Sequence, residues 1–282
     1  MHAMPGIDDY QFQPPGSASS SKPPDRRPAA AIVVVLIVAA AIGGYLWFRN
    51  PPSPASSGSN PAPPAAQAAK PDAGAPFPNL PQVEDSDTFV RERFAQLSKH
   101  PLLAAWLKTT GLVRNLVVVL ENASRGLTPS PRLRQLRPAG QFRVLKRADR
   151  IVIDPRNYER FTDIADAAAS IDAAAAARLY AGLKPLLQMA YDELGNEEPI
   201  DRALERAMTT LLSAPTVDGE IRLEVGDEGI GYVFANPTLE ALPGAQKQLI
   251  RMGPQNQRVI QSRLRQFALA AGLAAGIAPV KP

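Results

Sequence analysis

Residues 200–213, IDRALERAMTTLLS, are the stretch that decides the fold. Their apolar side chains recur at helical spacing, at Ile200, Ala203, Leu204, Ala207, Met208, Leu211 and Leu212. This period places all seven on one side of an α-helix and leaves the charged residues on the other side. The stretch therefore predicts an amphipathic helix that buries one face in a helical core.

The segments on both sides of this stretch show the same period. Asp172 is a typical N-cap for the preceding helix and Gly195 a typical stop, while Pro185 lies inside that helix and should kink it. The other predicted helices cover about residues 85–97, 101–107, 112–124, 155–168, 173–194, 238–252 and 255–275.

Two short stretches have strand character instead. Residues 142–153, FRVLKRADRIVI, predict a β-hairpin around Ala148-Asp149, and residues 220–225 and 230–234 alternate as a second hairpin. The predicted fold is therefore mainly α, of the α+β class: a compact multi-helix domain with two short β-hairpins over residues 84–277, followed by a tail at 278–282.

The front of the chain has a different composition, with 16 of the 29 prolines in the first 82 residues. Residues 29–48, AAAIVVVLIVAAAIGGYLWF, carry no charge and as a helix would span about 30 Å, the thickness of the bilayer core. They predict a single transmembrane helix between a disordered tail (1–28) and a Pro/Ala/Ser-rich linker (49–83). A cleaved signal peptide is the alternative, but the apolar run is long for one.

The charges beside this segment predict its orientation. Lys22, Arg26 and Arg27 precede it, whereas Arg49 follows and the next cation is Lys70. Cytoplasmic flanks carry the excess of Lys and Arg, so the tail is predicted in the cytoplasm and the large domain in the periplasm of a bacterial inner membrane. Two small-residue pairs, Ala39/Gly43 and Ala40/Gly44, would allow a homodimer through the span.

The composition argues against most kinds of catalysis. The chain has no Cys and only two His, at positions 2 and 100, and it carries no GxSxG, HExxH or Walker A motif. We therefore expect no metal and no cofactor, and we favour a binding role over an enzyme. Two alternatives stay open: an envelope hydrolase that uses carboxylates alone, and a periplasmic carrier of lipid or another small ligand.

Charge is distributed unevenly along the predicted domain. Residues 125–156 carry nine Lys/Arg and two acids, residues 157–240 six and sixteen, and residues 241–282 six and none. A periplasmic domain meets little nucleic acid, so we expect an envelope protein or an anionic envelope polymer as partner. The predicted anion-facing residues are Arg132, Arg134, Arg137, Arg143, Lys146 and Arg147. The alternative is that basic and acidic segments neutralise one another within the fold.

Several stretches resemble a bacterial family known as domain of unknown function 3014. They are Asn122–Gly126 (NASRG), Leu136–Pro138, Asp154–Phe161 (DPRNYERF), Lys184–Gly195 (KPLLQMAYDELG) and Gln246–Asn256 (QKQLIRMGPQN). The resemblance covers roughly residues 84–268 and implies a membrane-tethered bacterial domain, without any activity. Asn236 stands where the family often has Asp, and either residue can cap the helix that Pro237 opens.

Polar residues inside these stretches could form one polar ligand site. They are Asn157, Tyr158, Gln246, Lys247, Arg251 and Asn256. The alternative is that they cap helices and satisfy buried backbone groups.

Overall fold

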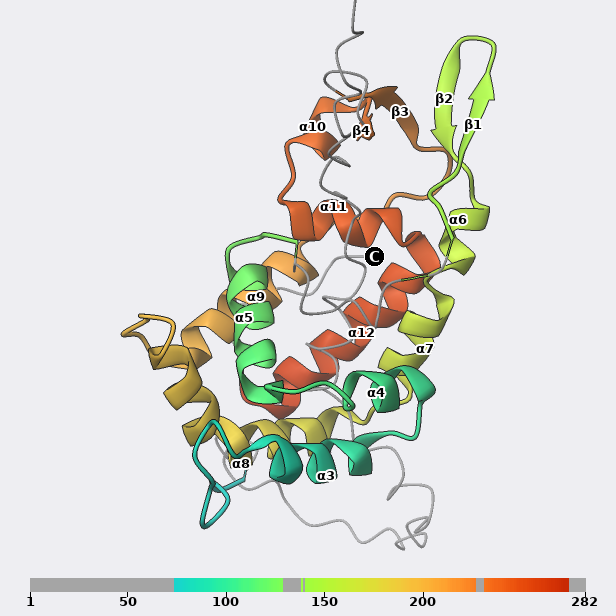
Figure 1. Ribbon diagram of the computed structural model, residues 1–282. Coiled ribbons are helices and arrows are strands. Elements are labelled where there is room, and N and C mark those ends of the chain that lie inside the picture. Colours follow the sequence, from blue (N-terminus) through green and yellow to red (C-terminus); the bar gives the residue numbers. More distant parts are fainter. Residues whose placement is uncertain (1–73, 129–137, 139, 227–230, 274–282) are drawn as a thin grey trace, which may run out of the picture.

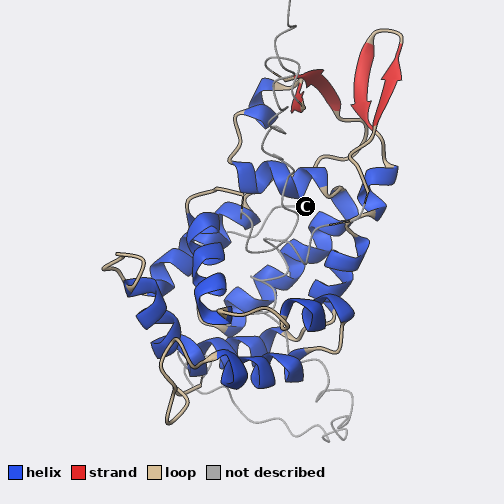
Figure 2. Ribbon diagram, viewed as in Figure 1, coloured by secondary structure: helices blue, strands red, loops and turns tan. Residues whose placement is uncertain are grey.

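A computed structural model describes residues 74–128, 138, 140–226 and 231–273, which form a helical bundle with a small sheet at one end (Figures 1 and 2). The helices are α3 (Asp87–Leu97), α4 (Pro101–Trp106), α5 (Leu112–Ser124), α6 (Arg156–Glu159), α7 (Thr162–Ala169), α8 (Ala173–Asp192), α9 (Ile200–Leu212), α10 (Pro237–Glu240), α11 (Gly244–Arg251) and α12 (Pro254–Ala270). The predicted fold class, mainly helical with a small β component, is confirmed.

The front of the chain is not covered by this description. The predicted tail (1–28), the predicted span (29–48) and most of the linker lie outside the described residues. Within the part that is described, no helix combines the length and hydropathy needed to cross a membrane.

The bundle core forms around α9, as its period predicts. All seven apolar residues of α9 are buried, and the helix packs against α5, α8, α11 and α12. The largest fully buried side chains of this core include Trp106, Tyr191 and Phe267. A helix whose whole apolar stripe meets four neighbours is stabilised mainly by tertiary packing.

The two predicted hairpins join into one antiparallel sheet. Its strands are β1 (Val144–Arg147), β2 (Arg150–Ile153), β3 (Arg222–Val225) and β4 (Tyr232–Phe234), in the order β1-β2-β3-β4. The pairing of β2 with β3, with Ile151 opposite Leu223, connects segments about 70 residues apart. One face of the sheet forms a second, small apolar cluster with Ile250 of α11.

Two predicted helices are each divided in the structure. The segment 155–168 splits at Arg160–Phe161 because Tyr158 packs with the sheet cluster, whereas Phe161 turns into the bundle core. The segment 238–252 splits into α10 and α11 at Pro243, whose ring nitrogen has no N–H for the helix. Both corrections occur where the chain passes from one apolar cluster to the other.

The residues just before position 84 pack on the bundle. Val83 is buried in its core, and the Phe77 N–H donates to the Gly182 carbonyl of α8 at 3.0 Å. A Cβ at Gly182 would lie 2.4 Å from the Phe77 ring, so the ring needs a glycine beneath it. The chain therefore joins the domain beside α8, at the end of the bundle away from the sheet (Figure 1).

Candidate functional site

The outward face of the sheet is lined by arginines. Strand alternation and the register, with Arg147 opposite Arg150 and Val152 opposite Arg222, place these three arginines on one face. Arg143 precedes β1 and continues the alternation, since its carbonyl accepts the Asp154 N–H. We call Arg143, Arg147, Arg150 and Arg222 the arginine face; the small apolar cluster covers the opposite side of the sheet.

Carboxylates neutralise only part of this face. Glu220 accepts Arg147 and Arg150 at 3.0 Å each, and Asp149 of the β1–β2 turn also pairs with Arg150, at 3.4 Å. Glu224 is a further acid on this side. Arg143 and Arg222 are exposed and form no ion pair within the described ranges. Four guanidinium groups against these three carboxylates leave a surplus of one positive charge, so the acidic segment neutralises the basic one only in part.

The predicted anion-facing set is only partly represented here. Arg132, Arg134 and Arg137 lie outside the described residues. Arg143 and Arg147 belong to the arginine face, whereas Lys146 lies opposite Ile151 and belongs to the other side of the sheet. Sequence reasoning missed Arg150 and Arg222. Their outward positions in alternating strands were visible, but the pairing of β2 with β3 was not.

Three residues of the predicted polar set meet where the sheet joins the bundle. The Asn157 side chain is fully buried; it accepts the Arg143 N–H at 2.8 Å and donates to the Arg143 and Asp154 carbonyls. Asn256 donates to the Tyr158 carbonyl at 2.7 Å. These amides satisfy backbone groups of the junction.

Two further members, Lys247 and Arg251, lie on α11 next to β4. Lys247 Nζ contacts Glu240 Oε1 at 2.5 Å and also donates to the Glu240 carbonyl. The Arg251 guanidinium carbon lies 4.9 Å from the centre of the Phe234 ring. Burial lowers the pKa of Arg251, and the charge of Glu240 opposes that effect.

Gln246, the last of the set, faces α9. Its side-chain amide donates to the Thr210 carbonyl at 2.8 Å and to the Ser213 hydroxyl. Gln257 and Gln261 of α12 donate to the carbonyls at the same helix end, including those of Leu211 and Ala214. Gln246 and Gln261 thus satisfy carbonyls that α9 cannot pair internally, and Gln257 satisfies those of Ala214 and Pro215 just beyond the helix.

The carboxylates around Gly195 are held by cations and by a buried tyrosine. Glu193 pairs with Arg114, and Glu198 pairs with Arg206 and accepts the Tyr191 hydroxyl at 2.9 Å. The hydrogen bonds from Arg206 and then Tyr191 lower the pKa of Glu198 to about 2. A general acid needs a pKa near the working pH, so Glu198 is unsuited to protonate a leaving group.

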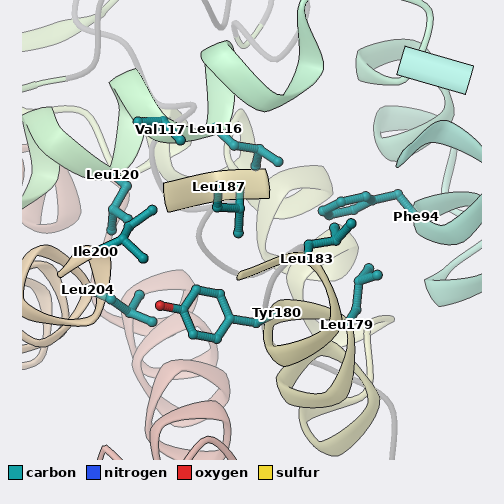
Figure 3. A pocket seen from close by; sticks show the side chains of 10 residues that line it. All are labelled: Phe94, Leu116, Val117, Leu120, Leu179, Tyr180, Leu183, Leu187, Ile200 and Leu204. Carbon is teal, nitrogen blue, oxygen red and sulfur yellow. The ribbon is translucent and has the colours of Figure 1, made fainter. Parts of the chain in front are cut away.

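A small apolar cavity lies among α3, α5, α8 and α9 (Figure 3). Its volume is about 40 Å³, and its lining is apolar apart from the Tyr180 hydroxyl, which contacts Asp201 at 2.6 Å. Ligand pockets usually measure about 300–1,000 Å³. In the described part of the chain, no three His, Cys, Asp or Glu residues are grouped so that they could hold a metal ion.

Comparison with known proteins identifies a family. The model of a family described as protein of unknown function (DUF3014) matches residues 112–268, from the start of α5 into α12. No curated protein and no solved structure matches the chain. The match spans more than half of the 282 residues and confirms the resemblance from residue 112 onward. The chain belongs to the DUF3014 family.

Proposed function

We propose that this chain is a single-pass protein of a bacterial inner membrane whose periplasmic domain binds an anionic envelope partner through the arginine face. The observation that carries the proposal is that Arg143 and Arg222 are exposed on that face and form no ion pair in the described part of the chain. Guanidinium groups offer paired N–H donors that fit carboxylates and phosphates, the common charged groups of anionic polymers.

The position of the arginine face favours a polymer over the lipid of the anchoring membrane. The tether joins the domain beside α8, and the sheet lies at the other end of the bundle (Figure 1). The proline-rich linker reaches about 30 Å as a coil and up to about 100 Å when extended. A domain held on such a tether can present its far end to the cell wall.

Retention on isolated cell wall tests the binding step. The detergent-solubilised full chain is compared with R143Q/R222Q and with the control R125Q/R202Q, which removes two exposed arginines from helical parts of the bundle. We expect R143Q/R222Q to lose retention and the control to keep it. Micelles that contain anionic phospholipid are added as competitor. Equal retention of both variants would remove the proposal, and complete displacement by these micelles would assign the face to lipid.

The predicted topology can be tested because the chain has no cysteine. A single cysteine is introduced at Ser20, in the tail, or at Ala148, in the exposed β1–β2 turn, and spheroplasts are treated with a membrane-impermeant maleimide. We expect labelling of A148C and protection of S20C until the cells are lysed. The reverse pattern would place the domain in the cytoplasm.

A further inference from the structure

Arg251 is a half-buried cation without an acceptor. It lies near the end of α11, and its guanidinium stacks over the ring of Phe234 from β4. Among the residues that the structure describes, no carboxylate or carbonyl oxygen accepts a hydrogen bond from it. A guanidinium has five N–H donors, and in the described structure only solvent accepts from them, at a position where water is partly excluded.

The nearest carboxylate, Glu240, is already engaged. One of its oxygens contacts Lys247 at 2.5 Å, and the other accepts the Phe234 N–H at 2.8 Å. Lys247 and Arg251 against Glu240 leave one positive charge without a counter-charge. A charge removed from water is costly unless it is paired and hydrogen-bonded, so an anion at this position would be stabilised.

We propose that Arg251 binds a single carboxylate group of a ligand, such as the C-terminal carboxylate of a peptide. A carboxylate accepts two parallel hydrogen bonds from a guanidinium, and its single charge matches the local surplus of one. The site lies between α11 and β4, on the side of the sheet opposite the arginine face. It goes beyond the proposed function, because it requires neither the arginine face nor the membrane topology.

Calorimetric titration of the full chain with N-acetyl-Ala-Ala tests this site. The same peptide as its C-terminal amide is the matched probe, and inorganic phosphate is the third. We expect the carboxylate to bind at least tenfold more tightly than the amide and more tightly than phosphate. A peptide amide that binds as well as the acid would overturn the proposal, and so would tighter binding of phosphate.

Variants locate the binding and control for folding. We expect R251Q to lose at least tenfold in affinity for the peptide acid and R251K to lose less. Lysine keeps the positive charge but lacks the two parallel N–H donors of a guanidinium. E240Q should bind more tightly, because it removes the nearest negative charge, which repels an incoming carboxylate. R258Q, an exposed arginine of α12 that pairs with Asp218, is the control and should bind as the wild type does. Equal losses in R251Q and R258Q would contradict the site.

A final variant distinguishes an external ligand from the chain itself. Asp227 and Glu228 stand between β3 and β4 in the sequence, outside the described residues. D227N/E228Q should bind the peptide acid as the wild type does. Binding seen only in D227N/E228Q would show that the chain fills the site itself, and the proposal would be wrong.

Discussion

The bundle and the sheet end differ in how several of their polar side chains are paired. In the bundle, Gln246 and Gln261 donate to carbonyls at the end of α9, and Tyr191 connects Glu121 with Glu198. At the sheet end, Arg143, Arg222 and Arg251 form no ion pair in the described part of the chain. The contrast concerns these named groups, since Trp106 Nε1 and the Gln248 amide are buried in the bundle without a hydrogen-bond partner among the described residues. We propose that a partner supplies the acceptors for the arginines of the sheet end.

The largest effect should come from removing bundle packing. Trp106 is fully buried in the core, whereas Val225 is 54% exposed at the end of β3. We expect W106A to lower the free energy of unfolding by about 3–5 kcal/mol, since it removes apolar contacts and leaves a cavity. V225A should change it by less than about 0.5 kcal/mol. Urea unfolding followed by circular dichroism measures both, and similar losses would contradict the assignment of the stabilising core to the bundle.

Removing a buried side-chain amide should lower the free energy of unfolding by a smaller amount. Gln261 is 3% exposed and donates to the Leu211 and Ala214 carbonyls at 3.0 Å each. Q261M keeps the shape but leaves carbonyls without that donor, so we expect a loss of about 1–3 kcal/mol. Gln255 on the same helix is exposed, and Q255M is the control. A Q261M protein as stable as Q255M would show that these carbonyls do not need the amide.

The Glu198 network should make stability depend on pH. Its pKa is lowered to about 2 in the folded protein, from 4.5 for a free side chain. The stabilisation is therefore present above about pH 5 and lost as the pH falls towards 2. We expect the wild-type melting temperature to fall over this window and E198Q to show a flatter profile. The exposed neighbour Glu197 provides the control E197Q; identical profiles in all three proteins would exclude the effect.

The smallest change in stability is expected at the arginine face. Arg143 and Arg222 are exposed, and neither is part of an ion pair in the described structure. The free energy of unfolding of R143Q/R222Q should therefore lie within about 0.5 kcal/mol of the wild-type value, even though we expect this variant to lose partner binding. The same urea titration checks this, and a loss above 1 kcal/mol would assign the two arginines to the fold.

The elements predicted correctly are those that depend on the local sequence pattern. The period of residues 200–213 identified α9 and every residue that it buries, and Asn236 caps α10 as expected. The sequence did not show that α6 and α7 separate at Phe161, because that break depends on two apolar clusters formed by distant segments. Nor did it show that Asp87 caps α5 from α3, with Gly111 and Leu112 N–H groups donating to it at 2.8 Å.

The candidate site was harder to predict for the same reason. Arg143 and Arg147 were found because they belong to a basic segment. Arg222 lies in a segment of net negative charge and joins them only through the pairing of β2 with β3. The residues of the predicted polar set do not all face the same place: Gln246 faces α9, while Arg251 faces β4.

Photo-crosslinking in living cells tests the central claim most directly. A photoreactive amino acid replaces Arg222 on the sheet in one strain and Arg202 on α9 in another, both in the full chain. Captured material is then analysed by mass spectrometry. We expect an envelope partner to be captured from position 222 and not from position 202. The same partner captured equally from both positions, or from position 202 alone, would contradict it.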